Sequence, residues 1–301
     1  MREPHAGSPP LSPPPPHVAG VSISNAERPI TAAPGHTKLD VVRYHQSLGA
    51  WLLPQLAPRP IAVVRCNDGS FDECFFQKHP SRGRGGHDES PPFLRLADVA
   101  DVVRAVQNGA YEFHTWGASF PRLERPDRIT LDLDPDADLP WTTMREAAGY
   151  VREFLQRLEL RWFVKTSGGK GLHFVLPITR RHSWPETRAF ARAIAEALAR
   201  KMPALFTARA GKDHRVRRIY VDYQRNAEGA TAVAGYSLRA RPGLPVSMPI
   251  AWDDLDADVR GGRFNIDNAA RFVAERAVDP WADYDRSRQT LSASMRRALN
   301  A

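Results

Sequence analysis

Two aspartates one residue apart interrupt an otherwise apolar stretch. Asp132 and Asp134 flank a leucine in DRITLDLDPD, residues 127 to 136. Side chains of a strand alternate between its two faces, so both carboxylates would share one face and the neighbouring leucines the other. Like charges this close raise the pKa of one carboxyl group unless a cation lies between them. A divalent metal such as Mg²⁺ or Mn²⁺ would remove the conflict. A solvated strand end that leads into a turn at Pro135 is the alternative.

A third carboxylate strengthens the metal interpretation. In RIYVDYQRN, residues 218 to 226, Asp222 lies between a valine and a tyrosine. An unpaired charge is costly to bury there, although a hydrogen-bonded core aspartate is the alternative explanation. Three strand-borne aspartates are what a two-metal phosphoryl-transfer centre needs, with ions at the attacking and the leaving oxygen.

A glycine-rich turn supplies groups that suit an anionic ligand. In KTSGGKGLHFVLPI, residues 165 to 178, one strand ends, SGGKG turns, and a second strand carries His173. Small residues let backbone N–H groups approach an anion, and Ser167, Lys170 and His173 add a hydroxyl, a cation and a ring donor. No Ser or Thr follows the Gly-Lys pair, so this is not a Walker A loop. The turn suits a triphosphate; a glycine-rich hairpin with a solvated lysine is the alternative.

Further candidates lie in two other segments. YSLRARPGLPVSMPIAW, residues 236 to 252, places Arg239 and Arg241 two residues apart in an extended segment. Arg239 could clamp a phosphate or balance the aspartates, or both arginines could simply face solvent. YEFHTWG presents His114 between two aromatic residues, as a core histidine or as a ligand to a nucleotide or DNA.

Composition favours an anionic partner. The chain of 301 residues has a formal net charge of +8 and a pI of about 9.8. Arg outnumbers Lys, and the planar guanidinium group of Arg can donate two hydrogen bonds to one phosphate. A glycosidase with paired carboxylates would explain neither this charge nor the glycine-rich turn.

No apolar run is long enough for a transmembrane helix, and no secretion signal is evident. Cys66 and Cys74 are too few for a disulfide framework, and we expect two reduced thiols in a cytoplasmic protein.

The elements around these residues indicate one mixed α+β domain. Residues 1–20 are Pro-rich and predict a disordered leader, which leaves residues 21–301 for the fold. Periodicity and turn signals predict helices, with caps at Thr37 and at Ser183 with Glu186, and strands joined partly by hairpins. The expected helices are 37–53, 94–109, 142–160 and 183–202, and the expected strands 59–66, 72–79, 128–134, 161–166, 172–178 and 218–224.

The motifs together resemble a known family. DLD, SGGKGLH, VDYQRN and YSLRARPG, in this order, resemble the polymerase domain of bacterial ligase D, the repair polymerase of nonhomologous end joining in the archaeo-eukaryotic primase superfamily. TKLDVVRYH, RPIAVVRC, CFFQKH and EFHTWG extend the resemblance over roughly residues 25 to 290. It implies a primase-type fold: a mixed sheet in an RRM-like catalytic subdomain, tightly packed against a second α/β layer.

The resemblance also implies roles for individual residues. The aspartates would bind two Mn²⁺ or Mg²⁺ ions as the catalytic triad. Ser167, Lys170, His173, His114 and Arg239 would contact the nucleoside triphosphate. A 5′-phosphate of downstream DNA would bind Arg28 and Lys38, with Asn25 as an accessory contact, while Phe75 and Phe76 would stack on bases.

The implied activity is template-directed gap filling and extension of DNA ends, with a preference for ribonucleotides. Gapped DNA or double-strand-break ends with a 5′-phosphate would be the substrate, and Ku and a separate ATP-dependent DNA ligase would be partners. We expect the protein at the nucleoid in the cytoplasm. Neither a KxDG adenylation motif nor a phosphoesterase domain is present, which predicts a stand-alone polymerase or a piece of a longer protein. A de novo primase and a non-catalytic DNA-end-bridging protein are the rival interpretations.

Overall fold

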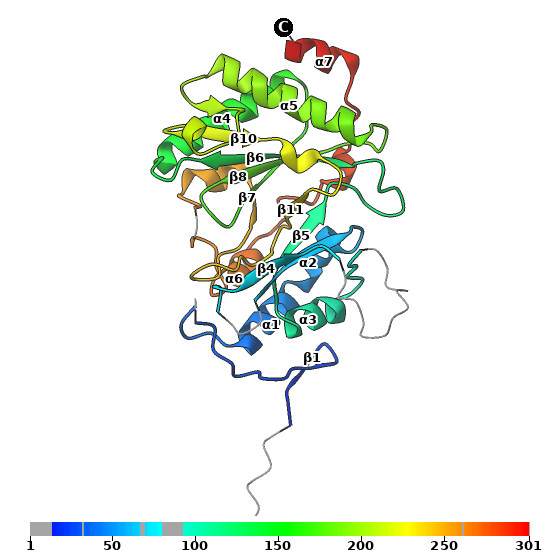
Figure 1. Cartoon of the computed structure of the whole chain (residues 1–301), viewed down its shortest axis with the longest axis vertical. Coiled ribbons are helices and arrows are strands. Elements are labelled where there is room, and N and C mark those ends of the chain that lie inside the picture. The colour runs from blue at the N-terminus through cyan, green and yellow to red at the C-terminus, as the bar shows by residue number, and fades with distance from the viewer. Residues whose placement is uncertain (1–13, 32, 67–69, 80–92, 261, 301) are drawn as a thin grey trace, which may run out of the picture.

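The computed structural model describes residues 14–31, 33–66, 70–79, 93–260 and 262–300, which form two main β-sheets flanked by helices (Figure 1). One sheet has the strand order β12-β7-β8-β6-β10-β9, the other β11-β5-β3-β4, and β1 and β2 form a separate hairpin. The strands are β1 His17–Val18, β2 Val21–Ser22, β3 Ile61–Cys66, β4 Cys74–Gln77, β5 Ala110–Trp116, β6 Arg128–Pro135, β7 Phe163–Thr166, β8 Leu172–Pro177, β9 Phe206–Thr207, β10 Ile219–Asp222, β11 Thr231–Val233 and β12 Pro249–Ile250. The helices are α1 Lys38–Ser47, α2 Gly49–Leu56, α3 Val99–Gln107, α4 Trp141–Arg157, α5 Trp184–Lys201, α6 Ala269–Ala274 and α7 Ala293–Asn300.

The helices cover the outer sides of the two sheets. In Figure 1, α4 and α5 lie above the six-stranded sheet, and α1 and α3 lie below the four-stranded sheet. The opposite faces of the two sheets therefore lie toward each other in the middle of the molecule. This is the mixed α+β architecture that the sequence predicts.

Two predicted helix caps are present. The Thr37 side chain accepts from the Asp40 backbone N–H, and the Asp40 carboxylate accepts from the Thr37 N–H at 2.8 Å. Ser183 and Glu186 form the same reciprocal pair at the start of α5. Such capping boxes satisfy backbone donors that a helix start leaves without partners.

The predicted helix over residues 37–53 is two helices. The chain leaves α-helical geometry at Leu48, where φ is −94° and ψ is 9°, and α2 begins at Gly49. A Cβ atom at Gly49 would lie 2.7 Å from a Val99 methyl carbon. The break therefore allows close packing against the start of α3, which the continuous apolar pattern does not reveal.

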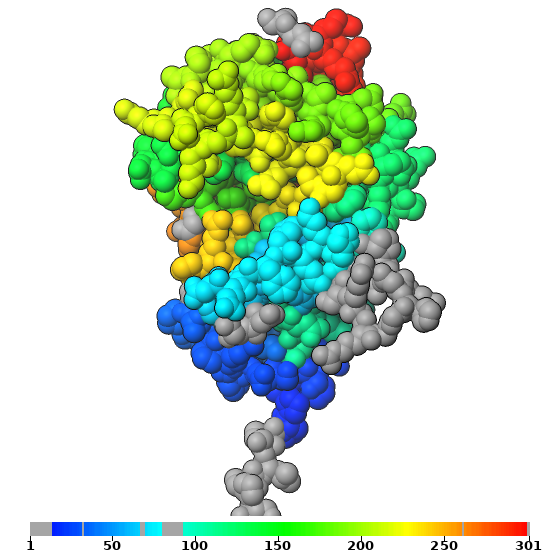
Figure 2. Space-filling model, viewed as in Figure 1, coloured from blue at the N-terminus to red at the C-terminus, as the bar shows by residue number. Residues whose placement is uncertain are grey.

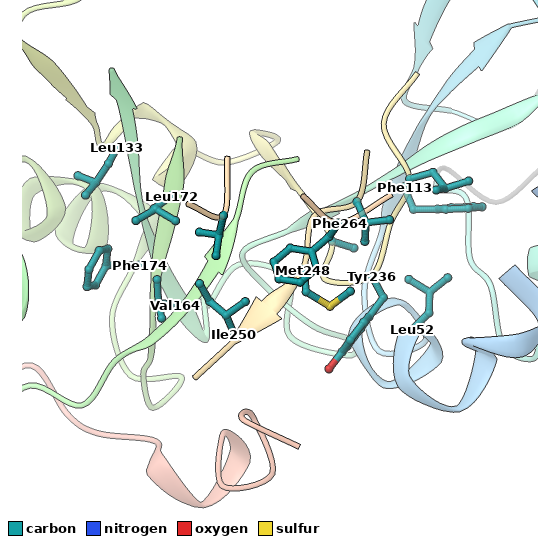
Figure 3. Packing of buried hydrophobic residues seen from close by; sticks show 14 of the residues in the cluster. Leu52, Phe113, Leu133, Val164, Leu172, Phe174, Tyr236, Met248, Ile250 and Phe264 are labelled. Atoms are coloured by element: carbon teal, nitrogen blue, oxygen red, sulfur yellow. The ribbon is translucent and has the colours of Figure 1, made fainter. Parts of the chain in front are cut away.

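One hydrophobic core joins the two layers. Figure 3 shows it running from Leu133 and Phe174 on the helix-covered face of the six-stranded sheet, past Met248, to Phe113 and Leu52 beneath the four-stranded sheet. All five side chains are buried. Because β12 pairs with β7 while the chain before it packs on the other layer, the two sheets are fixed relative to each other.

The expectation of two reduced thiols is wrong. Cys66 and Cys74 form a disulfide. They are direct cross-strand partners on β3 and β4, with Cα atoms 4.4 Å apart, which lies within the range that a disulfide spans. The prediction rested on cellular compartment and number of cysteines, whereas the hairpin register decides the contact.

The structured chain begins earlier than predicted. β1 pairs with β2, and the Ile23 N–H donates to the Pro16 carbonyl at 2.9 Å, so residues 16–20 are ordered rather than part of a disordered leader. The Asp68-Gly69 turn and the predicted loop at 80–92 lie outside the described residues. Among the helices that the structure describes, none is long and apolar enough to cross a membrane.

Candidate active site

Four polar residues form a row across the six-stranded sheet. Asp222 on β10 pairs with Asp132 on β6, Asp132 pairs with His173 on β8, and His173 pairs with Lys165 on β7. Directly opposed residues of neighbouring strands point to the same face. The strand register therefore gathers on one face side chains that are far apart in the sequence. His173 Nε2 lies 3.4 Å from Asp132 Oδ1.

A polar pocket of about 170 Å³ opens beside this row, between the two sheets. The six-stranded sheet and the turn after β7 supply one wall, and β5 and β11 supply another. Seven of the predicted site residues line it together: His114, Asp132, Asp134, Ser167, Lys170, His173 and Arg239.

Arginines neutralise the three aspartates. Arg225 Nε lies 3.6 Å from Asp132 Oδ2 and 3.3 Å from Asp222 Oδ2, while Arg215 pairs with Asp134. Burial raises the pKa of Asp132 to about 6; Arg225 opposes this change, and the charges of Asp222 and Asp134 add to it. Asp132 and Asp222 therefore need a nearby cation if both carboxylates are to stay ionised.

The glycine-rich turn is folded around the Ser167 hydroxyl. Ser167 Oγ accepts from the backbone N–H groups of Gly169 and Gly171, both at 3.2 Å. Gly168 has φ +70°, and a Cβ atom at Gly171 would lie 2.4 Å from the Leu133 carbonyl oxygen. Glycine is therefore required for the turn to pass this close to β6. Lys170 is exposed and donates to the Ala137 carbonyl.

A buried glutamate links two predicted nucleotide contacts. Glu112 Oε2 lies 2.8 Å from His114 Nε2 and 3.0 Å from Arg239 Nε, and Glu112 Oε1 accepts from the Ala240 N–H at 2.9 Å. Burial alone would raise the pKa of Glu112, but the His114 hydrogen bond and the Arg239 charge lower it to about 2. Glu112 stays ionised and orients the His114 ring and the Arg239 guanidinium group toward the pocket.

Lys165 ends the row as a buried amine. Its Nζ donates to Ser247 Oγ at 2.6 Å, and burial lowers its pKa well below the ordinary value. Burial, followed by the charges of Lys165 and Arg239, likewise lowers the pKa of His173. His173 is therefore a neutral imidazole beside Asp132.

Comparisons with known proteins assign the family. The model of the LigD primase-polymerase domain matches residues 37–281. The chain belongs to the LigD primase-polymerase family. This is a family of metal-dependent nucleotidyltransferases of the DNA polymerase and primase type.

Two curated relatives of this LigD-family chain are much longer than the chain itself. The chain is 45% identical over 295 residues to the multifunctional non-homologous end joining protein LigD of Pseudomonas aeruginosa, which covers 94% of the chain and 35% of that protein. It is 29% identical over 259 residues to the bifunctional LigD of Bacillus subtilis, which covers 84% of the chain and 42% of that protein. The chain thus spans between a third and a half of the length of these two relatives.

A solved structure has the same fold. The polymerase domain of Mycobacterium tuberculosis ligase D, determined in complex with DNA, superposes with a TM-score of 0.79 at 26% identity and covers 88% of this chain and 98% of that one. The likeness confirms the primase-type fold that the resemblance implied.

The donor set of this LigD-family site fits divalent cations. Asp132, Asp134 and Asp222 supply the hard carboxylate oxygens that Mg²⁺ and Mn²⁺ prefer, and Arg225 already places a positive charge between two of them. Within the described part of the chain, no group of three or more His, Cys, Asp or Glu side chains forms a ready metal cluster. In this structure Arg225 and Arg215 balance the charge of the carboxylates, a role that bound divalent ions would share.

The two predicted stacking aromatics point to different sides of the hairpin. Phe75 and Phe76 are both exposed, but neighbouring strand residues face opposite ways. The ring of Phe76 lies 5.2 Å from that of His114, and Phe76 lines a hollow of about 640 Å³ together with Asp222. Phe76 thus lies beside the face that carries Asp222, whereas Phe75 lines neither the 170 Å³ pocket nor the 640 Å³ hollow.

The predicted 5′-phosphate residues lie together, before and at the start of α1. The Arg28 N–H donates to the Asn25 carbonyl at 3.0 Å, and the Lys38 N–H donates to the Arg28 carbonyl at 2.9 Å. Lys38 Nζ donates to the Ser24 carbonyl at 2.9 Å. Burial and the charge of Arg28 lower the pKa of Lys38 to about 8. This group lines neither of the hollows beside the triad.

Sequence reasoning missed four residues of the site: Glu112, Lys165, Arg215 and Arg225. Two had a visible signal. Glu112 precedes His114 by two residues and so shares its face of β5, and Lys165 is a lone charge in an apolar strand. The two arginines lie in short 3-10 helices; Arg225 follows Asp222 by three residues, whereas only the fold brings Arg215 to Asp134 and Arg225 to Asp132.

Proposed function

We propose that this chain is a template-directed nucleotidyltransferase that fills gaps and extends DNA ends in nonhomologous end joining. The observation that carries the proposal is the register that opposes Asp222, Asp132 and His173 beside the Ser167 turn. Carboxylates next to a triphosphate-sized polar pocket are the arrangement that phosphoryl transfer needs.

Asp132, Asp134 and Asp222 would hold two Mn²⁺ or Mg²⁺ ions. Bound ions of this kind lower the pKa of an attacking hydroxyl group and neutralise charge on the leaving pyrophosphate. The chain itself would contribute positioning. Lys170, Arg239 and neutral His173 would orient the triphosphate, and Ser167 would keep the turn in the shape that admits it.

His114 would share this orienting role. Glu112 fixes the His114 ring and the Arg239 guanidinium on one wall of the pocket. Phe76, in edge-to-face contact with His114, offers an exposed aromatic surface to a base.

The substrate would be gapped DNA, or a broken end, with a 5′-phosphate at Arg28 and Lys38. Asn25 would be an accessory contact, and Phe75 would touch a strand outside the catalytic pocket. We further propose a preference for ribonucleotides, association with Ku and an ATP-dependent ligase, and a place at the nucleoid.

Primer extension on a gapped duplex tests the proposal. Wild-type protein with Mn²⁺ or Mg²⁺ should add one or more nucleotides to the 3′ end opposite the template, ribonucleotides faster than deoxynucleotides, and Asp132→Ala should not. A DNA-end-bridging protein would retain duplex binding and incorporate nothing in either form. A de novo primase would also synthesise on bare single-stranded template, so that template is a parallel reaction.

A further inference from the structure

A basic groove lies at the β9 edge of the six-stranded sheet. It encloses about 920 Å³ between α5, β9 and the end of β10. The side chains that matter for binding are cationic or aromatic: Arg192, Arg200, Arg209, His214, Arg218 and Tyr223.

The positive charge of this groove is largely uncompensated. The carboxylate that lines it, Glu196, is paired with Arg192 at 2.8 Å. Arg209 and Arg218 make no ion pair with any carboxylate among the described residues. Two guanidinium groups without a carboxylate partner, beside the partly exposed ring of Tyr223, suit a sugar–phosphate backbone with a stacked base.

The groove leads to the triad. Ala210 and Gln224 line both the groove and the 640 Å³ hollow that holds Asp222. The Gln224 backbone N–H donates to Asp222 Oδ1 at 2.7 Å. On the face shown in Figure 2, the yellow segment around residue 224 lies directly above the cyan hairpin of β3 and β4. A strand in the groove would therefore end at Asp222.

The chemistry decides which strand this is. The glycine-rich turn, Lys170 and Asp134 line the 170 Å³ pocket, whereas Asp222 lines the hollow on the other side of Arg225. In phosphoryl transfer the attacking and leaving oxygens lie on opposite sides of the phosphorus atom. If the triphosphate occupies the turn, the attacking hydroxyl must approach from the Asp222 side.

We propose that this groove binds the backbone of the nucleic-acid strand whose 3′-hydroxyl is extended, and directs that strand to Asp222. The proposal rests on the function proposed above. It adds a site on the catalytic layer for the upstream strand, separate from the Arg28 and Lys38 group on the other layer.

The test combines a double variant with backbone-neutralised DNA. Arg209→Ala/Arg218→Ala should raise KM for the primed substrate about tenfold, as expected when charge-assisted contacts to phosphate are lost, and leave KM for the nucleotide unchanged. Uncharged methylphosphonates in the primer strand near its 3′ end should weaken the wild type and leave the double variant unaffected. Arg157→Ala/Arg271→Ala, which removes two exposed arginines elsewhere, is the matched control.

Several results would overturn the proposal. One is a double variant that behaves like the control, and another is sensitivity to methylphosphonates in the template strand instead of the primer. Binding of a single-stranded oligonucleotide, measured by fluorescence anisotropy, separates a failure of the groove proposal from a failure of the proposed function. If wild type incorporates nothing, weaker oligonucleotide binding by Arg209→Ala/Arg218→Ala than by the control still supports the groove, and equal binding refutes it.

Discussion

Asp132 and Asp222 face each other as direct partners on antiparallel strands β6 and β10, and a single arginine lies between their carboxylates. Two partly buried carboxylates this close both stay ionised only if a cation shares the site; otherwise one of them takes up a proton. The fold thus places a cation-demanding pair beside the 170 Å³ polar pocket, and Arg225 supplies that cation within the protein itself.

Asp132→Asn should reduce nucleotide incorporation by about 1,000-fold or more, because removing one carboxylate charge weakens metal binding and charge stabilisation in the transition state. The melting temperature should not fall, since the change relieves repulsion from Asp222. Single-turnover incorporation and thermal unfolding measure the two effects. The same substitution at exposed Asp256 should leave both unchanged; similar losses in both variants would argue against a catalytic role.

The preference for a 5′-phosphate should depend on pH through Lys38. Its pKa is lowered to about 8, so the free protein loses this positive charge as the pH rises through that value, and phosphate attraction weakens. The ratio of Kd values for 5′-hydroxyl and 5′-phosphate gaps should therefore fall above about pH 8 in wild type. In Lys38→Ala the ratio should be lower than in wild type and should not change in this pH range, because only Arg28 of the pair then contacts the phosphate. In Lys38→Arg, whose side chain stays charged, the ratio should not fall in this range. A wild-type ratio that does not change with pH would remove Lys38 from the phosphate site.

Gly171→Ala should cost about 2 kcal/mol of stability or more and weaken triphosphate binding, because the new methyl group meets the Leu133 carbonyl and displaces the turn from β6. Gly149 in α4 is the matched control, since nothing lies within 4 Å of a Cβ atom there. Gly149→Ala should stabilise the protein by about 1 kcal/mol. Denaturant unfolding and nucleotide titration report the two properties; tight nucleotide binding by Gly171→Ala would contradict the assigned turn geometry.

Asp127→Asn should lower the free energy of unfolding by about 3 kcal/mol, because it breaks a buried ion pair and leaves a charged partner. Asp127 Oδ1 lies 2.6 Å from Arg59 Nη1, and the Ser119 hydroxyl donates to Oδ2 at 2.6 Å. Asp283→Asn, at an exposed ion pair, should change stability by less than about 0.5 kcal/mol.

The contribution of Asp127 to stability should also depend on pH in the acid range. Burial alone would raise the pKa of Asp127, but Arg59 and Arg128 lower it to about 2, below its ordinary value of 3.8. The folded state therefore binds this proton less readily than the unfolded state, so the stabilisation is complete above the ordinary value and is lost as the pH falls toward 2. Wild type should lose more stability than Asp127→Asn across this interval in urea unfolding.

The sequence predicted strands β6, β7, β8 and β10 of the six-stranded sheet and the caps of α1 and α5, because these depend on local patterns; it did not predict the two-residue edge strands β9 and β12. It also placed Asp132 and Asp134 on one face. Asp222 was joined to them because it is a lone carboxylate in a second apolar strand, but its direct pairing with Asp132 depends on the strand register, which leaves no local signal. The break at Leu48 and the disulfide between Cys66 and Cys74 were missed for the same reason: each depends on a contact between segments.

The antiparallel register of β6 also determines where the chain can accept an inserted residue. Inserting one residue between Arg128 and Asp132 would turn both aspartates toward the helices and bring a leucine to face the nucleotide. Inserting residues between Asp136 and Pro140, beyond the end of the strand, would leave the pairing of Asp132 with Asp222 unchanged. The gene should therefore accept an insertion beyond the end of this strand far better than an insertion within it.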